Sequence, residues 1–332
     1  MNFNRRQFTQ SAAALATLAS LGISTRASAQ AVAIENLKVI VGFAAGGTAD
    51  ATSRRVAAKL SPGYAKAATV ENRTGAGGQI AVQAIKGQPA DGSMMVLTPM
   101  SILGIYPHTY KKLPYDPVAD FQPISVGAVF EYGLAVGPAV PASVTNLEQF
   151  TAWCKANPDK ANYGSPAAGS QPHFVAALYG RAVGIDYKHI PYRGTQPAVV
   201  DLLGGNIASV SGPVGDFLQH LPTGRVRLLA TSGKARNRFT PSVPTYAEQG
   251  MKDFFFDEWF GFFTVAGTPA PIVQRLSAAV REALASKDVI DGLATFGLEA
   301  RGTTPEQLAA MLKADTDKWA PLVKQIGFTA DA

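Results

Sequence analysis

The stretch VGFAAGGTAD, residues Val41–Asp50, lies between the apolar run LKVIV and the helix-like sequence ATSRRVAAKL. An apolar strand, a glycine-containing turn and a helix start, in this order, form the β-turn-α unit of α/β proteins. The first amide N–H groups of a helix have no partner inside the helix, and together with the helix dipole they bind anions. Gly46 and Gly47 would let the backbone approach such an anion closely. We interpret this stretch as an anion-binding loop, with a plain strand-to-helix turn as the alternative.

The glycine loops do not match the two common nucleotide-binding motifs. A Walker loop requires lysine after its last glycine, whereas Thr48 follows Gly47 here. The sequence GAGGQI, residues 75–80, carries Ile80 where a dinucleotide-binding fingerprint has its last glycine. What remains is the simpler interpretation, in which backbone amides at a helix start hold an anion.

Strand-like and helix-like segments alternate along the rest of the chain. Helical patterns lie between the strands, and two begin with the residues of a capping box, Thr145 with Glu148 and Thr304 with Gln307. This alternation predicts an α/β protein with largely parallel sheets covered by helices. The strand-like segments are LKVIVGF, MMVLT, ISVGAVF, GLAVG, NIASVS, VRLLATS and FFTVAG.

Two segments have the pattern of crossings between domains. In SVGAVFEYGLAVG, two apolar strands are separated by the residues EYG, and DFFFDEWFGFFTVAG is too long for one ordinary strand. If the chain leaves one domain near residue 131 and returns near residue 256, residues 132–255 form a second lobe. Residues 30–131 and 256–332 then form the first lobe. A cleft between two lobes is the usual place for a small ligand, and we expect the ligand there.

Residues 1–29 have the layout of an export signal peptide. Arg5 and Arg6 precede the apolar stretch SAAALATLASLGIS, and the sequence ASA provides a small-residue cleavage site. The arginine pair followed by Phe8 indicates the twin-arginine type. The apolar stretch is too short for a transmembrane helix. We therefore expect cleavage near Ala29/Gln30 and a periplasmic location.

The composition excludes several classes of protein. Apolar residues make up 47% and charged residues 16% of the 332 residues, which allows a sizeable core and argues against disorder. Three of the arginines that contribute to the net charge of +6 belong to the export signal. The remaining chain lacks the basic stripe of a nucleic-acid-binding protein. The single cysteine, Cys154, shares a helical face with Leu147 and Phe150, and we expect it to be buried rather than reactive.

A second loop has the same character as the first. The sequence NYGSPAAGSQPHF, residues Asn162–Phe174, again leads small residues and hydroxyl groups into a helix start. Ser170 can cap this helix, and Pro172 lies in its first turn. Two such helix starts, one in each proposed lobe, would hold an anion from opposite sides.

The sequence contains no motif for catalysis or for a metal. GSPAAGS is not the G-x-S-x-G elbow of serine hydrolases, and there is no H-E-x-x-H motif or Cys/His cluster. Only His173 lies beside a candidate loop, and a histidine in a first helical turn is more often structural. We expect binding without turnover, no cofactor and no metal. The histidines are scattered over the sequence: His108, His173, His189 and His220.

Seven stretches in order resemble the Bug family, the periplasmic solute-binding receptors of tripartite tricarboxylate transporters. They are FAAGGTAD, VENRTGAGG, YKKLPYDPVADFQPI, KANPDKANYGS, HIPYRGTQPAVVDLLGG, DEWFGFFTVAGTPAPIV and TPEQLAAMLKAD. The resemblance implies an α/β fold of the two-lobed periplasmic binding protein clamshell (type II-like), each lobe a sheet flanked by helices, with the ligand in the interlobe cleft.

The resemblance also implies a function. Such a protein captures a small organic acid, held through loop amides, hydroxyl groups and water, and delivers it to membrane permease subunits of the transporter. The implied partners are the carboxylate ligand and, transiently, the permease; the protein is expected to be monomeric and to bind no nucleic acid. Two alternatives stay open: a periplasmic ligand sensor for a two-component signalling system, and a secreted hydrolase. The sequence contains no motif that supports the hydrolase.

The two loops supply the ligand-binding residues that the resemblance implies. Phe43 would form an aromatic wall, Asp50 would orient the loop or water, and His173 would be a polar neighbour. An amino-acid ligand is not favoured, because SVSGPVGDF replaces a stretch that commonly carries a Phe-Asp-Asn element, and the roles of Ser211 and Gly212 stay open. The expected contacts are Phe43, Ala45, Gly46, Gly47, Thr48, Asp50, Ser165, Ala168, Gly169, Ser170 and His173.

Overall fold

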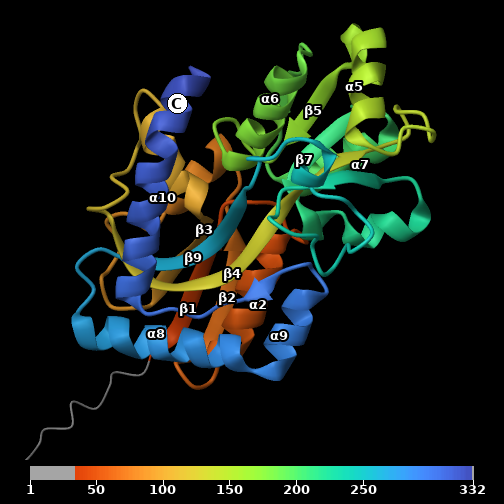
Figure 1. Ribbon diagram of the computed structural model, residues 1–332. Coiled ribbons are helices and arrows are strands. Elements are labelled where there is room, and N and C mark those ends of the chain that lie inside the picture. The colour runs from red at the N-terminus through yellow and green to blue at the C-terminus, as the bar shows by residue number, and fades with distance from the viewer. Residues whose placement is uncertain (1–33, 331–332) are drawn as a thin grey trace, which may run out of the picture. The chain divides into compact units, whose positions relative to one another are not determined.

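The computed structural model of the protein describes residues 34–330, and the expected export signal lies outside these residues (Figure 1). No helix between residues 34 and 330 combines the length and the apolar character needed to cross a membrane. The strands are β1 Ile34–Val41, β2 Ala65–Asn72, β3 Met94–Pro99, β4 Phe121–Val136, β5 Asn162–Ser165, β6 Lys188–Pro191, β7 Ser209–Pro213, β8 Arg227–Thr231, β9 Asp257–Val265 and β10 Glu299–Ala300. The α-helices are α2 Thr48–Leu60, α3 Gln79–Gln83, α4 Tyr106–Thr109, α5 Leu147–Ala156, α6 Gln171–Val183, α7 Thr195–Gly204, α8 Ala270–Ala285, α9 Lys287–Ala294 and α10 Pro305–Ile326.

The described strands form one mixed sheet in the order β2-β1-β3-β9-β4-β7-β5-β6, and β8 and β10 also pair with β4. β1 is parallel to β2 and β3, and β5 is parallel to β6 and β7. The middle of the sheet is antiparallel, because β9 runs opposite to both β3 and β4. The expectation of largely parallel sheets is therefore correct at the two ends and wrong in the middle. There the outgoing strand β4 and the returning strand β9 lie side by side and must run in opposite directions.

β4 is one continuous strand, whereas the sequence suggested two strands separated at the residues EYG. The strand does not break because its partner changes without a gap: Glu131 pairs with Asp257 of β9, and the next residue, Tyr132, pairs with Pro213 of β7. Gly133 continues the strand and packs closely, since a Cβ atom there would lie 2.6 Å from a methyl carbon of Leu228. β4 thus pairs with β7 of one parallel group and, through β9, is linked to the other.

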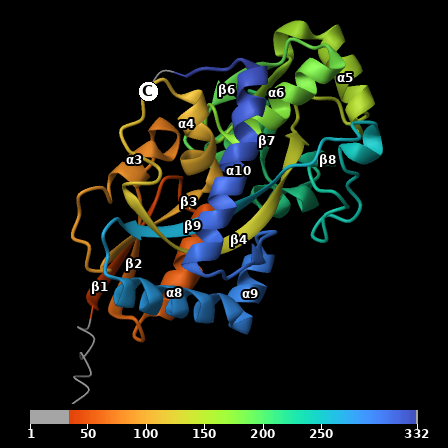
Figure 2. The same ribbon diagram turned by 60° about the vertical axis from the view of Figure 1, so that its left-hand side comes forward.

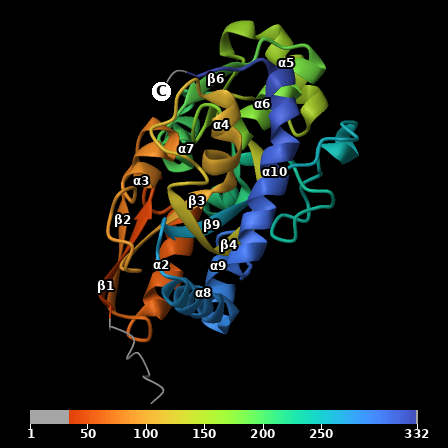
Figure 3. The same cartoon turned by 90° about the vertical axis from the view of Figure 1, so that its left-hand side faces the viewer.

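The helices cover the sheet and tie its two ends together. Figures 1 and 3 place α8 and α9 at the end of the β1–β3 group that is far from β5 and β7. α10 runs along the molecule from α8 to the region of α6 and β6 (Figure 2). Phe174 of α6 packs on Trp319 of α10 with ring centroids 6.1 Å apart, and on Phe328 beyond it at 5.6 Å. The last helix therefore packs on α6 as well as on β4.

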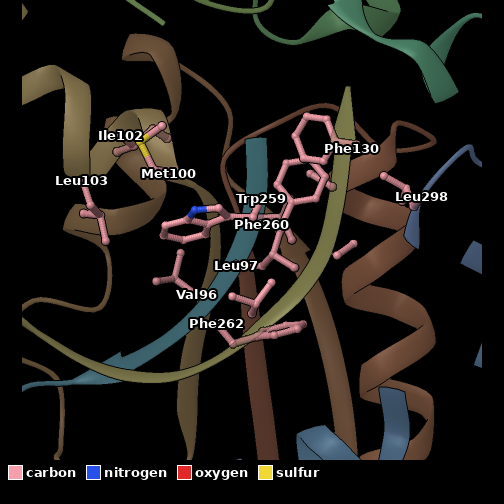
Figure 4. Close-up of a cluster of buried hydrophobic side chains, with 14 of the residues drawn as sticks. Val96, Leu97, Met100, Ile102, Leu103, Phe130, Trp259, Phe260, Phe262 and Leu298 are labelled. Carbon is pink, nitrogen blue, oxygen red and sulfur yellow. The ribbon is translucent and has the colours of Figure 1, made fainter. Parts of the chain in front are cut away.

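The hydrophobic core has two described clusters. The larger one extends under β1, β3, β4 and β9, and Figure 4 shows part of it, with the rings of Phe130 and Phe260 packed together. Their ring centroids are 4.4 Å apart. The smaller cluster lies around β7 and α7 and includes Phe217 and Leu202. The cysteine behaves as predicted, since Cys154 is buried on α5 together with Leu147 and Phe150.

One predicted helix start is confirmed and the other is shifted. Thr304 and Gln307 form the expected capping box of α10, with Pro305 in the first turn. The expectation for Thr145 and Glu148 is wrong by one residue, because the side chain of Asn146 accepts the amide N–H of Gln149 instead. Asparagine is at least as good an N-cap as threonine, so the helix begins at the later position.

Candidate ligand-binding site

A cavity opens beside the first turn of α2, with an empty volume of about 540 Å³ that includes space open to solvent. It lies where β4 changes its pairing partner, since Phe130 and Tyr132 on the two sides of that point both line it. The lining residues are Phe43, Ala44, Gly47, Thr48, Ala49, Pro99, Ser101, Ile102, Tyr106, Phe130, Tyr132, Pro166, Ala167, Ser170, Pro172, Gly194, Thr195, Gln196, Pro213, Asp216, Glu258 and Phe260.

Both loops chosen from the sequence reach this cavity, but only part of each loop lines it. The lining includes Phe43, Gly47, Thr48 and Ser170. The other residues expected at the site belong to the same loops and lie outside the lining: Ala45, Gly46, Asp50, Ser165, Ala168, Gly169 and His173. Ser211 and Gly212 also lie outside the lining, and the hydroxyl group of Ser211 donates to the carbonyl of Pro172.

The start of α2 faces the cavity and holds a carboxylate of the protein. Gly47 is the N-cap residue and has no side chain with which to cap the helix. The backbone N–H of Thr48 donates to Oδ1 of Asp216 over 2.8 Å. A carboxylate at a helix N-terminus is stabilised by the unpaired amides and by the helix dipole. The first amide of this helix is therefore occupied by a carboxyl group of the protein itself.

Asp50 holds the first loop in its conformation through hydrogen bonds. Its Oδ2 accepts the N–H of Gly46 at 3.0 Å and the Nε–H of Arg54 at 2.9 Å, and Asn72 joins its Oδ1 to the carbonyl of Phe43. Burial alone would raise the pKa of Asp50, but the hydrogen bonds, led by that from Arg54, outweigh burial and lower it. Asp50 is therefore an ionised side chain that holds the loop in its conformation.

Asp216 is a residue of the cavity that the sequence reasoning missed. It follows β7 in the short helix Val214–Asp216, is 4% exposed, and lines the cavity. Burial raises the pKa of this carboxyl, and hydrogen bonds from Thr195, Thr48 and Gln196 oppose the rise. The stretch SVSGPVGDF therefore brings a carboxyl group to the cavity, although it replaces the Phe-Asp-Asn element. The available signal was an acidic residue just after a buried strand.

Replacing Asp216 with alanine is expected to lower the free energy of unfolding by about 1–3 kcal/mol, because the N–H of Thr48 and the hydroxyl of Thr195 lose a buried acceptor. Urea unfolding curves measure the change. Asp216→Asn is the matched control, since its amide oxygen still accepts from Thr48 and the loss should be smaller. Equal stability of the two variants would contradict the role given to this acceptor.

The second loop directs its hydroxyl groups into its own backbone. Ser165 and Ser170 both donate to the carbonyl of Ala167, at 3.1 and 2.7 Å. Ser170 is the N-cap residue of α6 as predicted, although its side chain makes no capping bond. The first amide of α6, that of Gln171, donates to the hydroxyl oxygen of Ser101. This loop is therefore rigidly hydrogen-bonded before any ligand enters.

Gly169 and Ala168 hold the outer side of the second loop. Gly169 has φ +73°, a conformation that residues with side chains rarely adopt, and its N–H donates to Nδ1 of His173 over 3.0 Å. The carbonyl of Ala168 accepts from the hydroxyl of Tyr110 over 3.1 Å. Both residues thus position the loop without lining the cavity themselves.

His173 forms a buried pair with His189. Their rings stack with centroids 3.9 Å apart and planes 20° apart, and Nε2 of His189 lies 2.7 Å from the hydroxyl oxygen of Ser165. Burial lowers the pKa of His189 to about 4. Burial, and then repulsion from His189, lower the pKa of His173 to about 2. Both rings are neutral at physiological pH and support the second loop.

Much of the cavity wall is aromatic. Phe43, Tyr106, Phe130, Tyr132 and Phe260 all line it, and the sequence reasoning had identified only Phe43. The signal for Phe130, Tyr132 and Phe260 was the aromatic character of β4 and β9, which was interpreted as a domain crossing. Tyr106 is the first residue of α4. Aromatic and apolar walls with a few polar groups are typical of sites for small molecules.

Glu258 is the second acidic residue of the cavity. It is 3% exposed, and its Oε1 accepts both the backbone N–H and the hydroxyl group of Ser101, at 2.7 and 2.5 Å. Burial raises its pKa to about 8 despite these bonds. Among residues 34–330, neither lysine nor arginine lines the cavity, and no three His, Cys, Asp or Glu residues gather as a metal site.

Comparison with known proteins places the chain in a family. Residues 52–328 match the family described as "Tripartite tricarboxylate transporter family receptor". The chain belongs to this family. BugT of Bordetella pertussis (strain Tohama I) is 32% identical to the receptor over 311 residues, which cover 93% of this chain and 95% of BugT.

Solved structures agree with this assignment. The periplasmic binding protein BugD is 28% identical and superposes with a TM-score of 0.84, over 90% of this chain and 99% of BugD. The R. palustris protein Rpa4515, solved with adipate, is also 28% identical, with a TM-score of 0.84 over 90% of this chain and 99% of its own. The resemblance to the Bug family is confirmed, and the fold of this receptor is that of a periplasmic binding protein.

Proposed function

We propose that this receptor captures a small organic acid in the cavity and delivers it, chemically unchanged, to the membrane permease subunits of a tripartite transporter. One observation carries the proposal: the start of α2, which faces the cavity, binds a carboxylate, that of Asp216. Rpa4515 was solved with adipate, a dicarboxylate, which supports an acid as the class of ligand.

We propose that the ligand's carboxylate contacts the wall formed by Gly47, Thr48 and Ser170, with Phe43 beside its apolar part. Helix starts can hold a carboxylate without lysine or arginine, and here the ligand would share or replace Asp216 and Ser101, which accept from the first amides of α2 and α6. The remaining loop residues then act indirectly, by keeping the two loops in shape. They are Ala45, Gly46, Asp50, Ser165, Ala168, Gly169 and His173.

We further propose that residues 34–131 with 256–330 act as one lobe and residues 132–255 as the other. Two features support this division. β4 passes from β9 to β7 between Glu131 and Tyr132, and the chain returns through β9, which begins at Asp257. The cavity is lined by residues of both parts, so that closure of the lobes would enclose the ligand.

A panel of small acids is expected to raise the melting temperature of the purified receptor. A ligand at about 100 times its Kd adds ~2.7 kcal/mol to the free energy of unfolding. For domains of this size, this corresponds to an increase of several degrees. Thermal-shift assays with aliphatic and aromatic acids, and with neutral sugars of similar size as controls, measure it. A clear shift with a sugar and none with any acid would contradict the proposal.

We propose that residues 1–29 export the folded receptor to the periplasm by the twin-arginine route. The support is the arginine pair Arg5-Arg6 ahead of an apolar stretch, together with the family of periplasmic receptors to which the chain belongs. Replacing both arginines with lysine is expected to leave the precursor in the cytoplasm. Cell fractionation followed by immunoblotting measures the distribution, and unchanged export of the variant would refute the twin-arginine route.

A further inference from the structure

Part of the cavity wall comes from neighbouring positions of β4 and β9 that share one face of the sheet. Phe130 of β4 lies directly opposite Glu258 of β9 in the antiparallel register, and paired residues point to the same face. Tyr132 and Phe260, each two residues further along its strand, point to this face as well. All four line the cavity. An aromatic wall thus carries two polar groups, the hydroxyl of Tyr132 and the carboxyl of Glu258.

The Tyr132 hydroxyl lacks a partner. The residue is 1% exposed, and its hydroxyl group makes no hydrogen bond to any residue in the described range 34–330. A buried hydroxyl without a partner is unfavourable, so native proteins rarely keep one unless another molecule satisfies it. The residue lines the cavity while its hydroxyl oxygen is buried, so a polar group of a bound molecule supplies the missing hydrogen bond once the neighbouring side chains shift to admit it.

Glu258 has hydrogen-bonding capacity left on the same wall. Both bonds from Ser101 go to Oε1, which leaves Oε2 outside these contacts. The ionisable groups that act on it from neighbouring elements, Asp315 of α10 and Tyr106 of α4, carry no positive charge. Burial raises the pKa of Glu258 to about 8, so its carboxyl is mostly protonated at neutral pH and can donate a hydrogen bond.

We propose that the Tyr132 hydroxyl and the Glu258 carboxyl form a second polar subsite, which binds an uncharged hydroxyl or carbonyl group on the body of the ligand. This inference rests on the proposed function, in which the starts of α2 and α6 hold the ligand's carboxylate. The charge of the cavity favours an uncharged group on the ligand over a second carboxylate. Asp216 and Glu258 line it, no lysine or arginine between residues 34 and 330 does, and a second buried carboxylate would have no cation to pair with. The ligand class is a hydroxy- or oxo-substituted monocarboxylic acid.

Calorimetric titration with two matched series of acids tests the subsite. The aromatic probes are benzoate, para-hydroxybenzoate, terephthalate and para-(aminomethyl)benzoate, and the aliphatic probes are hexanoate and its ω-hydroxy, ω-carboxy and ω-amino derivatives. In the series that binds, the hydroxy acid is expected to bind more tightly than the unsubstituted, dicarboxylic and amino acids. If the dicarboxylate or the amino acid binds most tightly, the inference is wrong while the proposed function stands. If none of the acids binds, the proposed function fails, and the inference with it.

Two variants test whether Tyr132 and Glu258 cause the preference for the hydroxy acid. Tyr132→Phe and Glu258→Gln are each expected to weaken binding of the hydroxy acid by about tenfold or less, because one hydrogen bond is lost. The affinity for the unsubstituted acid should stay nearly unchanged. Tyr246→Phe is the matched control, since the Tyr246 hydroxyl is also buried without a partner within the described chain but does not line the cavity. Circular dichroism confirms that each variant is folded. Equal affinity of Tyr132→Phe and the parent for every acid would overturn the inference.

Discussion

Replacing Gly47 with leucine is expected to abolish detectable binding of the acid ligand while the protein remains folded. A Cβ atom on Gly47 would lie 3.5 Å from Oδ1 of Asp216 and 3.7 Å from Cγ of Gln196, both of which line the cavity. The rest of a leucine side chain would therefore occupy the space next to the start of α2. Gly47 has φ −83°, which any residue adopts, so the backbone is not strained. Calorimetric titration measures the loss.

Two variants separate this effect from general damage. Gly63→Leu is the matched control, because a Cβ there meets no atom within 4 Å, and its affinity should equal that of the parent. Ser165→Ala is expected to weaken binding by about tenfold or less, since this buried hydroxyl supports the second loop but does not line the cavity. Gly169→Leu is unsuitable, because φ +73° would strain the backbone. Parent-like binding by Gly47→Leu would show that the ligand lies elsewhere.

The free energy of unfolding is expected to fall by a few kcal/mol as the pH decreases from 7 to 4, largely through His173 and His189. Their ordinary pKa is 6.5, and in the folded protein burial lowers it to about 2 and about 4. The unfolded chain therefore takes up protons first. The stability that these two neutral rings contribute is fully present above pH 6.5 and is lost as the pH falls towards 4. Urea unfolding at a series of pH values measures the decrease.

Removing one ring of the pair should flatten this dependence. In His189→Gln the loss of stability between pH 7 and 4 is expected to be smaller than in the parent, while His108→Gln, at an exposed position, is the matched control. Glu258 acts in the opposite direction, because its pKa is raised from 4.5 to about 8 and its contribution is lost as the pH rises through that range. An unchanged acid dependence in His189→Gln would refute the role of the pair.

Local features of the receptor could be predicted from the sequence because they depend on residues close together in the chain. The unit of strand, glycine turn and helix at Val41–Asp50 was recognised correctly, since a helix start exposes its amides wherever it occurs. The capping box of Thr304 and Gln307 was recognised for the same reason. The order of seven short stretches was enough to identify the family, although the strand that continues through Glu131 was interpreted as two.

The cavity itself was decided by the tertiary structure. Asp216 meets Thr48 across 168 positions of sequence, and Glu258 meets Ser101 across 157. No periodicity or local motif reports such contacts, because they form only when β4 and β9 bring distant segments together. The sequence by itself therefore determined the family, the two loops and the position of the first helix start. Only the folded chain decided which loop residues reach the cavity, and it buried two carboxyl groups there among aromatic rings, where burial raises their pKa values.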